Sequence, residues 1–439
     1  MRWVVLAALA GVLLAHAWRL REPRRRTGLR LAGGTAAALL AFAVLSTAWS
    51  GYPWLTFERS VTLGLLLACV APMALIVTRR TGFAPLLADA IVAGAAAVAV
   101  GGLILLAVSY HDAVQRPNAG TPTRYRGLGE NPNTAAMLLA VALPLAVSRL
   151  VQDGAGRRQR LLAGACVLLL AGSVFMSSSR GAIGGVVLGV ATVIALTAVS
   201  FRRRLAHVAI AAILVAIGLG AASLPKPLPL SAGQRNSANV GLSRGADPLS
   251  AGQRNSANVG LSRGADVSKP RPQDSQGFPK AGDKSTSVRD LTSITQSGRL
   301  WAWKGAFHTG NRKPVLGHGF GTEERVFVDL YYWFQGSRPE NSFLGMYLML
   351  GGAGVLLLVA LLALIAVAAW RAVRRLPLDG ASAGLAGAFV AGTILAVVQS
   401  YLYSVGNIAT LSFWTVGAAL LALAARSRTA SADPPGDGA

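Results

Sequence analysis

Three short polar segments interrupt an otherwise apolar chain, and their residues could bind an anion or transfer a proton. In the first, Ser177–Gly181, Arg180 lies between two apolar runs that leave almost no connecting loop. A guanidinium at the edge of a bilayer needs an anionic partner or a wet cavity, so Arg180 is a functional candidate. The alternative is a side chain that extends to the lipid headgroups.

The second segment, Ser297–His308, is predicted to be helical. Arg299 and Trp303 are four residues apart in it and should share one helix face. That face would offer a cation beside an aromatic ring. The alternative is an interfacial helix that tryptophans anchor to the membrane, with a solvated arginine.

The third segment, Arg338–Leu344, stands where a long hydrophilic loop ends and an apolar run begins. Glu340 and Asn341 would open a helix, whose positive dipole end favours a carboxylate. Helix capping is the alternative role for Glu340. A fourth polar stretch precedes an earlier apolar run, and its candidate binding residues are Arg124, Arg126, Asn131 and Asn133.

Other signals are weaker. The glycines at 317, 319 and 321 predict a tight turn, because their spacing is not that of a dinucleotide-binding loop. His308 and His318 stand apart from any Cys or carboxylate at ligand spacing. We therefore expect no metal and no cofactor.

The elements that must position these residues are membrane helices. The chain has 439 residues, of which 53% are hydrophobic and 14% charged, and its mean hydropathy is +0.49. Runs near the roughly 20 residues that cross a bilayer recur along it. We predict an all-α, polytopic bundle of about eleven crossings: 3–18, 31–49, 60–78, 86–108, 134–151, 161–179, 181–201, 208–224, 342–370, 380–401 and 408–425.

Arginines gather in alternate connections, at 19–30, 79–80, 149–160, 202–204, 371–375 and 426–428. The positive-inside rule places these connections in the cytoplasm and the long loop, 225–340, on the extracytoplasmic face. Cleavage after Ala17 as a signal peptide would reverse this orientation. Much of the net charge of +24 lies in these arginine clusters. The clusters lack the interleaved aromatic residues that would stack bases, which argues against nucleic-acid binding.

The chain divides into an N-terminal bundle (1–224), the loop (225–340), a C-terminal bundle (341–426) and a cytoplasmic tail (427–439). The loop opens with a perfect tandem duplication over 229–247 and 248–266, which we expect to be flexible because it is polar and rich in Gly and Ser. Helical order should resume over about 288–340.

These segments, in this order, resemble the bacterial O-antigen ligase and O-antigen polymerase family. The resemblance rests on N-x-N at Asn131–Asn133, S-R-G at Ser179–Gly181, R-x-x-x-W at Arg299–Trp303, P-x-x-G-x-G at Pro314–Gly319 and the box Glu340–Leu344 that closes the loop. It runs from about residue 125 to 370.

The resemblance implies a glycosyltransferase in the cytoplasmic (inner) membrane that acts outside the cytoplasm. Its donor would be an undecaprenyl-diphosphate-linked saccharide, and its acceptor a glycan or a lipid. Arg180 and Arg299 match the family's arginines, and guanidinium forks suit a leaving diphosphate. Arg124, Arg126, Asn131, Asn133, Trp303, Arg338 and Asn341 would bind substrate.

Ligases of this family usually carry a histidine where this chain has Glu340, a departure that favours a polymerase-like relative. We expect Glu340 to be the general base, oriented by Asn341, with His318 in reserve. A transporter or flippase is the main alternative, and it should have polar pairs or broken helices near mid-membrane. Only Asp89 and the glycines at 351, 352 and 354 point that way. A non-enzymatic scaffold would have no need of Arg180.

Overall fold

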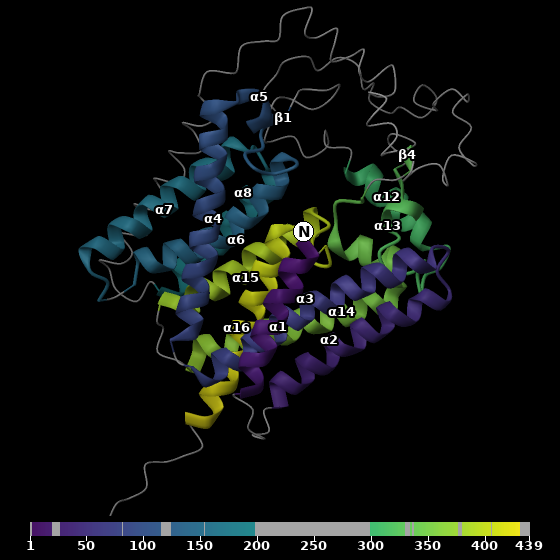
Figure 1. Ribbon diagram of the computed structural model, residues 1–439, viewed down its shortest axis with the longest axis horizontal. Coiled ribbons are helices and arrows are strands. Elements are labelled where there is room, and N and C mark those ends of the chain that lie inside the picture. The colour runs from purple at the N-terminus through teal and green to yellow at the C-terminus, as the bar shows by residue number, and fades with distance from the viewer. Residues whose placement is uncertain are drawn as a thin grey trace, which may run out of the picture.

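A computed structural model gives the fold, which is mostly helical (Figure 1). The structure describes residues 2–19, 27–80, 82–115, 124–152, 154–197, 299–329, 334–335, 338–375, 380–404 and 406–430. Within these ranges nine helices are long and apolar enough to cross a membrane, and a shorter apolar helix covers Val4–Arg19. The predicted multi-pass helical class is confirmed. The predicted crossing 208–224, the duplication and residues 288–298 lie outside the described residues.

The long helices are α1 (Arg2–Arg19), α2 (Thr27–Leu45), α3 (Pro53–Arg79), α4 (Phe83–Val108), α6 (Pro132–Leu150), α7 (Arg157–Met176), α8 (Arg180–Thr197), α14 (Ser342–Arg375), α15 (Gly380–Val398) and α16 (Ile408–Ala430). Helix α3 begins seven residues before the predicted crossing at 60, because Pro53 suits the first turn of a helix and lacks the N–H that would otherwise be unsatisfied there.

Shorter elements are the 3-10 turn η1 (Ser46–Ala48) and the helices α5 (Tyr110–Ala113), α12 (Arg299–Gly310) and α13 (Glu323–Val326). Two antiparallel pairs join β1 (Val114–Gln115) to β2 (Arg124–Tyr125) and β3 (Val328–Asp329) to β4 (Phe334–Gln335). Sequence periodicity missed these strands because two residues are too few to show an alternating pattern.

Helix α6 is the centre of the bundle. Its residues from Ala135 to Ser148 are all buried, and it packs against α4, α7, α8, α15 and α16. Close approach of α8 to α15 depends on small residues: a Cβ on Gly189 would lie 2.7 Å from the Gly387 carbonyl oxygen. Such backbone contact is how apolar helices gain van der Waals packing in a membrane.

Helix α14 is broken at Gly351, whose φ of 62° and ψ of −162° are not helical. The carbonyls of Leu348 and Met349 accept hydrogen bonds from the N–H groups of His318 (3.0 Å) and Gly319 (2.8 Å), and Gly352 N–H donates to Pro314 (2.7 Å). The loop segment 314–319 therefore satisfies the backbone groups that the break frees, as an apolar environment requires.

The glycines at 317, 319 and 321 all have positive φ, which fits the predicted tight turn. They also allow close packing. A Cβ at Gly317 would collide with the backbone of Met349, so this turn approaches α14 as only glycine can.

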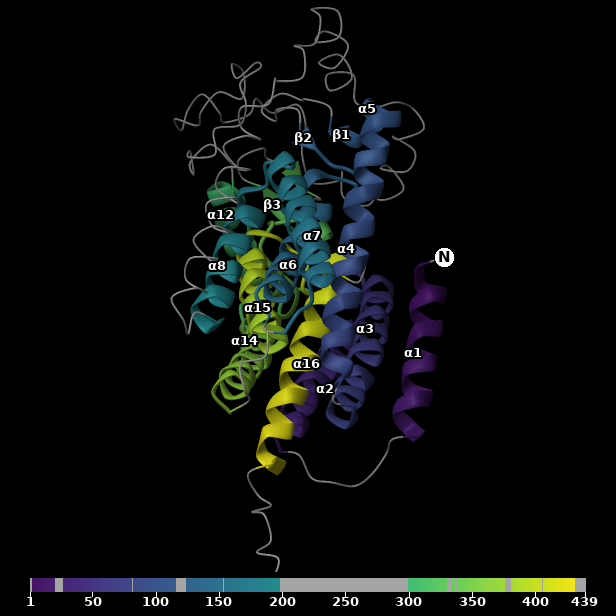
Figure 2. The same cartoon turned by 90° about the vertical axis from the view of Figure 1, so that its left-hand side faces the viewer.

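One end of the bundle collects the starts of α6, α8 and α14 and the end of α15. Helix α15 runs antiparallel to α8, since Gly181 packs on Val398 and Gly189 on Gly387. Helices α5 and α12 and the short strands lie toward this end, and α16 terminates at the other (Figure 2). Both α6 and α16 finish in arginine-bearing segments.

Candidate functional site

The first contact of the site joins Arg299, which opens α12, to Glu340. The guanidinium Nε and Nη2 lie 2.9 and 2.8 Å from Glu340 Oε2. The Arg299 side chain is 20% exposed and that of Glu340 is 47% exposed. The pair is thus accessible to a ligand from solvent.

Glu340 has a φ of 49°, a left-handed conformation that few residues other than glycine adopt. Its neighbours hold it there. The Trp303 indole N–H donates to the Pro339 carbonyl at 3.1 Å. Arg299 and Trp303, four residues apart on α12, therefore both bind the segment 339–340. Strain of this kind is typical of sites that hold a side chain in a set position.

Asn341, and not Glu340, caps α14. Its Oδ1 accepts from the N–H groups of Phe343 (2.9 Å) and Leu344 (3.0 Å). The capping alternative for Glu340 therefore does not describe this helix start, whose first N–H groups the adjacent amide already satisfies.

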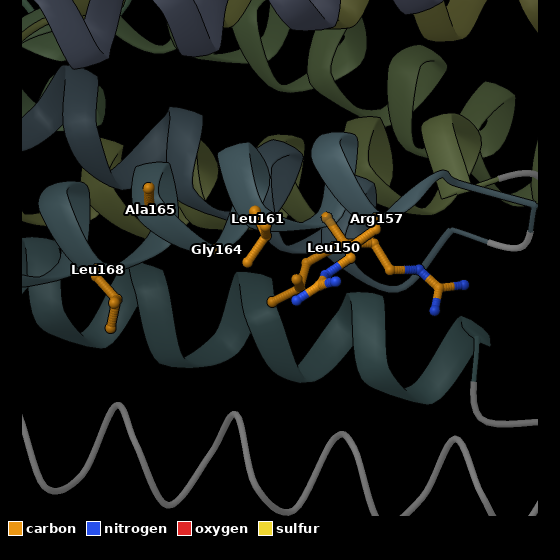
Figure 3. Close-up of a pocket in the computed structure, with 7 residues that line it drawn as sticks. Leu150, Arg157, Leu161, Gly164, Ala165 and Leu168 are labelled. Atoms are coloured by element: carbon orange, nitrogen blue, oxygen red, sulfur yellow. The ribbon is translucent and has the colours of Figure 1, made fainter.

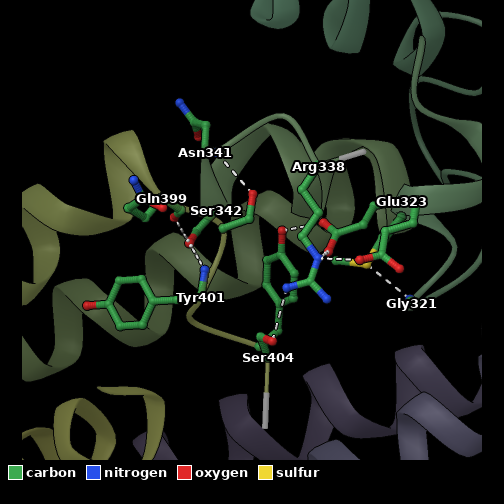
Figure 4. Close-up of polar contacts among 12 residues, drawn as sticks. Gly321, Glu323, Arg338, Asn341, Ser342, Gln399, Tyr401 and Ser404 are labelled. Carbon is green, nitrogen blue, oxygen red and sulfur yellow. Dashed lines mark hydrogen bonds and ion pairs between the residues drawn. The ribbon is translucent and has the colours of Figure 1, made fainter. Parts of the chain in front are cut away.

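The closing box is tied to the turn after α15 (Figure 4). Asn341 N–H donates to Ser400 Oγ at 3.0 Å, and Ser342 Oγ donates to the Gln399 carbonyl at 2.7 Å. Tyr401 N–H donates back to Ser342 Oγ at 3.0 Å. Among the described residues, the buried side-chain nitrogen of Gln399 has no hydrogen-bond partner. This turn fixes where the box stands relative to the bundle.

The S-R-G segment reaches the same turn from the other side. Arg180 is the first residue of α8, and Gly181 packs against Val398 so closely that a side chain would collide there. Val398 is followed directly by Gln399 and Ser400, the partners of the closing box. A continuous path of contacts therefore leads from the start of α8 to Glu340 and Arg299.

The N-x-N segment, Asn131–Asn133, forms the start of α6 and connects it to the turn before Arg180. Asn131 Oδ1 caps α6 by accepting from Asn133 and Thr134 N–H. Arg124 is buried and donates to the Ser177 carbonyl (2.9 Å) and to Asn133 Oδ1 (3.0 Å), so it links the start of α6 to the turn that precedes Arg180. Three of the predicted binding residues thus form one assembly.

Two predicted residues have other contacts. Arg126 Nε donates to the Asp112 carbonyl at 2.7 Å, which ties it to α5. His318 Nε2 donates to the Thr309 carbonyl at 3.2 Å, and burial lowers the pKa of its imidazole. Its backbone pairs with Leu348, six residues and about 9 Å along the axis from Ser342, the first residue of α14. His318 is therefore displaced from Glu340.

Arg338 belongs to a neighbouring polar cluster (Figure 4). Its Nε lies 2.7 Å from Glu324 Oε1 and 3.5 Å from Glu323 Oε1, and its Nη1 donates to Ser404 Oγ at 3.3 Å. A cavity of about 30 Å³ adjoins these residues, enough space for about one water molecule.

Glu323 is the buried acid of this cluster. It is 5% exposed and accepts from the Tyr403 hydroxyl at 2.6 Å. Burial raises its pKa, although Arg338 and the hydroxyl partly oppose the shift. Arg59 of α3 also lines the cavity, and its buried Nε has no hydrogen-bond partner in the part of the chain that the structure describes.

Sequence reasoning missed Arg59, Glu323 and Tyr403 because they come from three distant segments and form no motif. One signal was available: Arg59 and Glu323 are among the few charged residues in a chain that is only 14% charged. Their approach also needs Gly345, where any side chain would collide with the Tyr403 hydroxyl.

The arrangement suits an anion. The starts of α6, α8 and α14 lie at one end of the bundle, and each directs the positive end of its dipole there. Arg299 opens α12 and pairs with Glu340 of the closing box, and Arg180 opens α8 next to Gly181, which packs on Val398 at the end of α15. Within the part of the chain that the structure describes, no group of three His, Cys, Asp or Glu residues could hold a metal ion.

Two comparisons with known proteins bear on the family. A search of curated proteins gave no match to the chain. A family model described as O-antigen ligase matches residues 165–359, a range that contains Arg180, Arg299 and the closing box. By this match the chain carries an O-antigen ligase domain over residues 165–359, within a multi-pass membrane protein.

Proposed function

We propose that this protein transfers saccharide units from undecaprenyl diphosphate to a growing glycan or a lipid acceptor at the extracytoplasmic face of the inner membrane. Membership of the family implies a polysaccharide ligase or polymerase role and lipid-linked polysaccharide substrates. The donor, the membrane face and the residues below are our proposal. The ion pair between Arg299 and Glu340, the first residue of the closing box, is the observation that carries it.

In the proposed step, an acceptor hydroxyl oxygen bonds to the anomeric carbon of the donor saccharide. The bond from that carbon to the diphosphate oxygen breaks, and the diphosphate leaves with the electron pair. Arg180 and Arg299 stabilise the charge that develops on it, because fixed donors of this kind need no reorganisation during the reaction. The hydroxyl proton passes to the Glu340 carboxylate.

Donor binding would also free the base. A diphosphate and the Glu340 carboxylate both suit the fork of Arg299. A bound diphosphate that takes the carboxylate's place at Arg299 leaves Glu340 as an unpaired acceptor next to the reacting carbon. The proposal thereby couples proton transfer to the presence of donor.

Four of the predicted binding residues hold other parts of the site in place. Trp303 and Asn341 hold the two sides of Glu340, and Arg124 with Asn133 supports the turn before Arg180. We propose that they preorganise the site and that His318 has no part in the proton transfer.

The transporter alternative receives little support. Asp89 pairs with Arg149 at 2.7 Å, near the ends of helices where basic residues gather. The break in α14 at Gly351 is the feature that such a protein would need, but backbone groups of the segment 314–319 already occupy it. Neither feature offers an open polar site within the bundle.

Glycan analysis after deletion separates the functions. Accumulation of single lipid-linked units means a polymerase, and long unattached chains mean a ligase. Precursor trapped on the cytoplasmic side means a flippase and contradicts the proposal. In reactions with purified protein, EDTA should leave the transfer rate unchanged, because guanidinium groups and not a metal would stabilise the leaving group.

Topology is tested by a single cysteine at position 250 in a chain whose Cys69 and Cys166 have been replaced. We expect labelling by a membrane-impermeant maleimide from the extracytoplasmic side. Labelling from the cytoplasmic side alone would defeat the glycosyltransferase model.

A further inference from the structure

A second site lies at the end of α7 that is away from Arg180. A groove with a volume of about 660 Å³ runs along α7, and Leu150 at the end of α6 contributes to its wall (Figure 3). The α7 residues that line it recur at helical spacing on one face: Arg157, Arg160, Leu161, Gly164, Ala165 and Leu168.

Most of the groove is apolar and open. Leu161 and Leu168 are 65% and 51% exposed, and Gly164 and Ala165 between them leave a hollow. A Cβ added at Gly164 would meet only a methyl of Leu150, at 3.9 Å. The hollow has room for a hydrocarbon chain beside a membrane-spanning helix.

One end of the groove is cationic. Arg157 and Arg160 lie in the first turn of α7, which contains no acidic residue. Among the described residues, neither guanidinium has an ion-pair partner. Guanidinium forks bind phosphate oxygens in a bidentate manner, and basic pockets at the ends of membrane helices are suited to anionic headgroups.

We propose that this groove binds one anionic glycerophospholipid. Its phosphate lies between Arg157 and Arg160, and an acyl chain follows α7 from Leu161 to Leu168, a distance of about 10 Å along the axis. Charge complementarity identifies the headgroup class, and the continuous apolar stripe below it identifies a chain as the rest of the ligand.

This lipid is distinct from the glycosyl donor. Helix α7 has 20 residues, so it is about 30 Å long, close to the hydrocarbon thickness of a bilayer. The groove starts at one end of α7, and the turn that leads to Arg180 follows the other end. A diphosphate that reacts beside Arg180 cannot also occupy the groove, so the inference stands independently of the proposed function.

The test measures lipid retention by native mass spectrometry on full-length protein in neutral detergent. The probes are phosphatidylglycerol and phosphatidylcholine with the same acyl chains. We expect the wild type to prefer phosphatidylglycerol, and R157Q/R160Q to weaken its binding by about tenfold or more. Arg158→Gln is the matched control, because Arg158 is on the same turn but does not line the groove.

Gly164→Phe fills the hollow and should weaken phosphatidylglycerol binding while both arginines remain. Equal losses in R158Q and in R157Q/R160Q would mean general surface charge and would overturn the site. Wild-type affinity in R157Q/R160Q would also overturn it. Displacement of the lipid by glycerol 3-phosphate at equal concentration would show that the acyl chain contributes nothing, which contradicts the groove.

Discussion

Replacing Glu340 by glutamine tests the proposed coupling between donor binding and the base. Glutamine keeps the size of the side chain and removes both its charge and its ability to accept the proton. In the structure that carboxylate lies 2.8 to 2.9 Å from two nitrogens of Arg299. The variant should therefore lose a competitor for the donor phosphate and the proton acceptor together.

The two effects differ in size. The pair is partly exposed, 20% for Arg299 and 47% for Glu340, and such pairs contribute about 0.2–1 kcal/mol. Removing the competing carboxylate should thus lower the donor KM by at most about fivefold. Loss of a general base should lower kcat by about 10²–10⁴-fold. The expected variant binds donor at least as well as the wild type and turns it over far more slowly.

The assay is single-turnover and steady-state transfer by purified protein with a synthetic lipid-diphosphate saccharide. Glu58→Gln, at an exposed position near the start of α3, is the matched control and should leave both constants unchanged. A kcat for Glu340→Gln close to that of the wild type would refute the base. A donor KM that rises instead of falling would mean that Glu340 only positions Arg299.

Three further predictions concern the arginines, the buried acid and helix packing. Arg180→Ala and Arg299→Ala should each lower transfer by about 100-fold or more; near-normal glycan length on gels of inserted protein would contradict this. Burial raises the pKa of Glu323 above 4.5, so the folded state favours its protonated form. The Tm should therefore fall as pH rises from 4.5 to the raised pKa of the folded state. Glu323→Gln should flatten this dependence of Tm on pH. The same dependence in the variant and the wild type would refute the role of Glu323. Gly189→Ala forces a methyl group against α15 and should lower the free energy of unfolding by about 1–3 kcal/mol. Gly184→Ala is the control: a Cβ there meets nothing within 4 Å, so the free energy of unfolding should stay the same or rise by up to about 1 kcal/mol. Equal melting temperatures for the two variants would contradict the packing argument.

Several residues selected from the sequence have structural partners that no motif could reveal. The sequence predicts that Arg124 is a substrate-binding cation, and in the structure its guanidinium donates to the Ser177 carbonyl and to Asn133 Oδ1. Arg126 is also an arginine and lies only two positions from Arg124, but its guanidinium donates to the Asp112 carbonyl of α5. Spacing along the chain places a charge at the right end of the bundle, but it does not give the direction of the side chain.

The sequence by itself determined the membrane class, most helix positions and the order of the polar segments. These features are local: the thickness of a bilayer fixes the length of an apolar run, and one run is read without its neighbours. The tertiary structure alone decided which groups meet. Arg299 and Glu340 are 41 positions apart and Tyr403 and Glu323 are 80 apart. The packing of α14 against the loop and the turn after α15 brings them within hydrogen-bond distance, and that packing depends on side-chain shapes from the whole bundle.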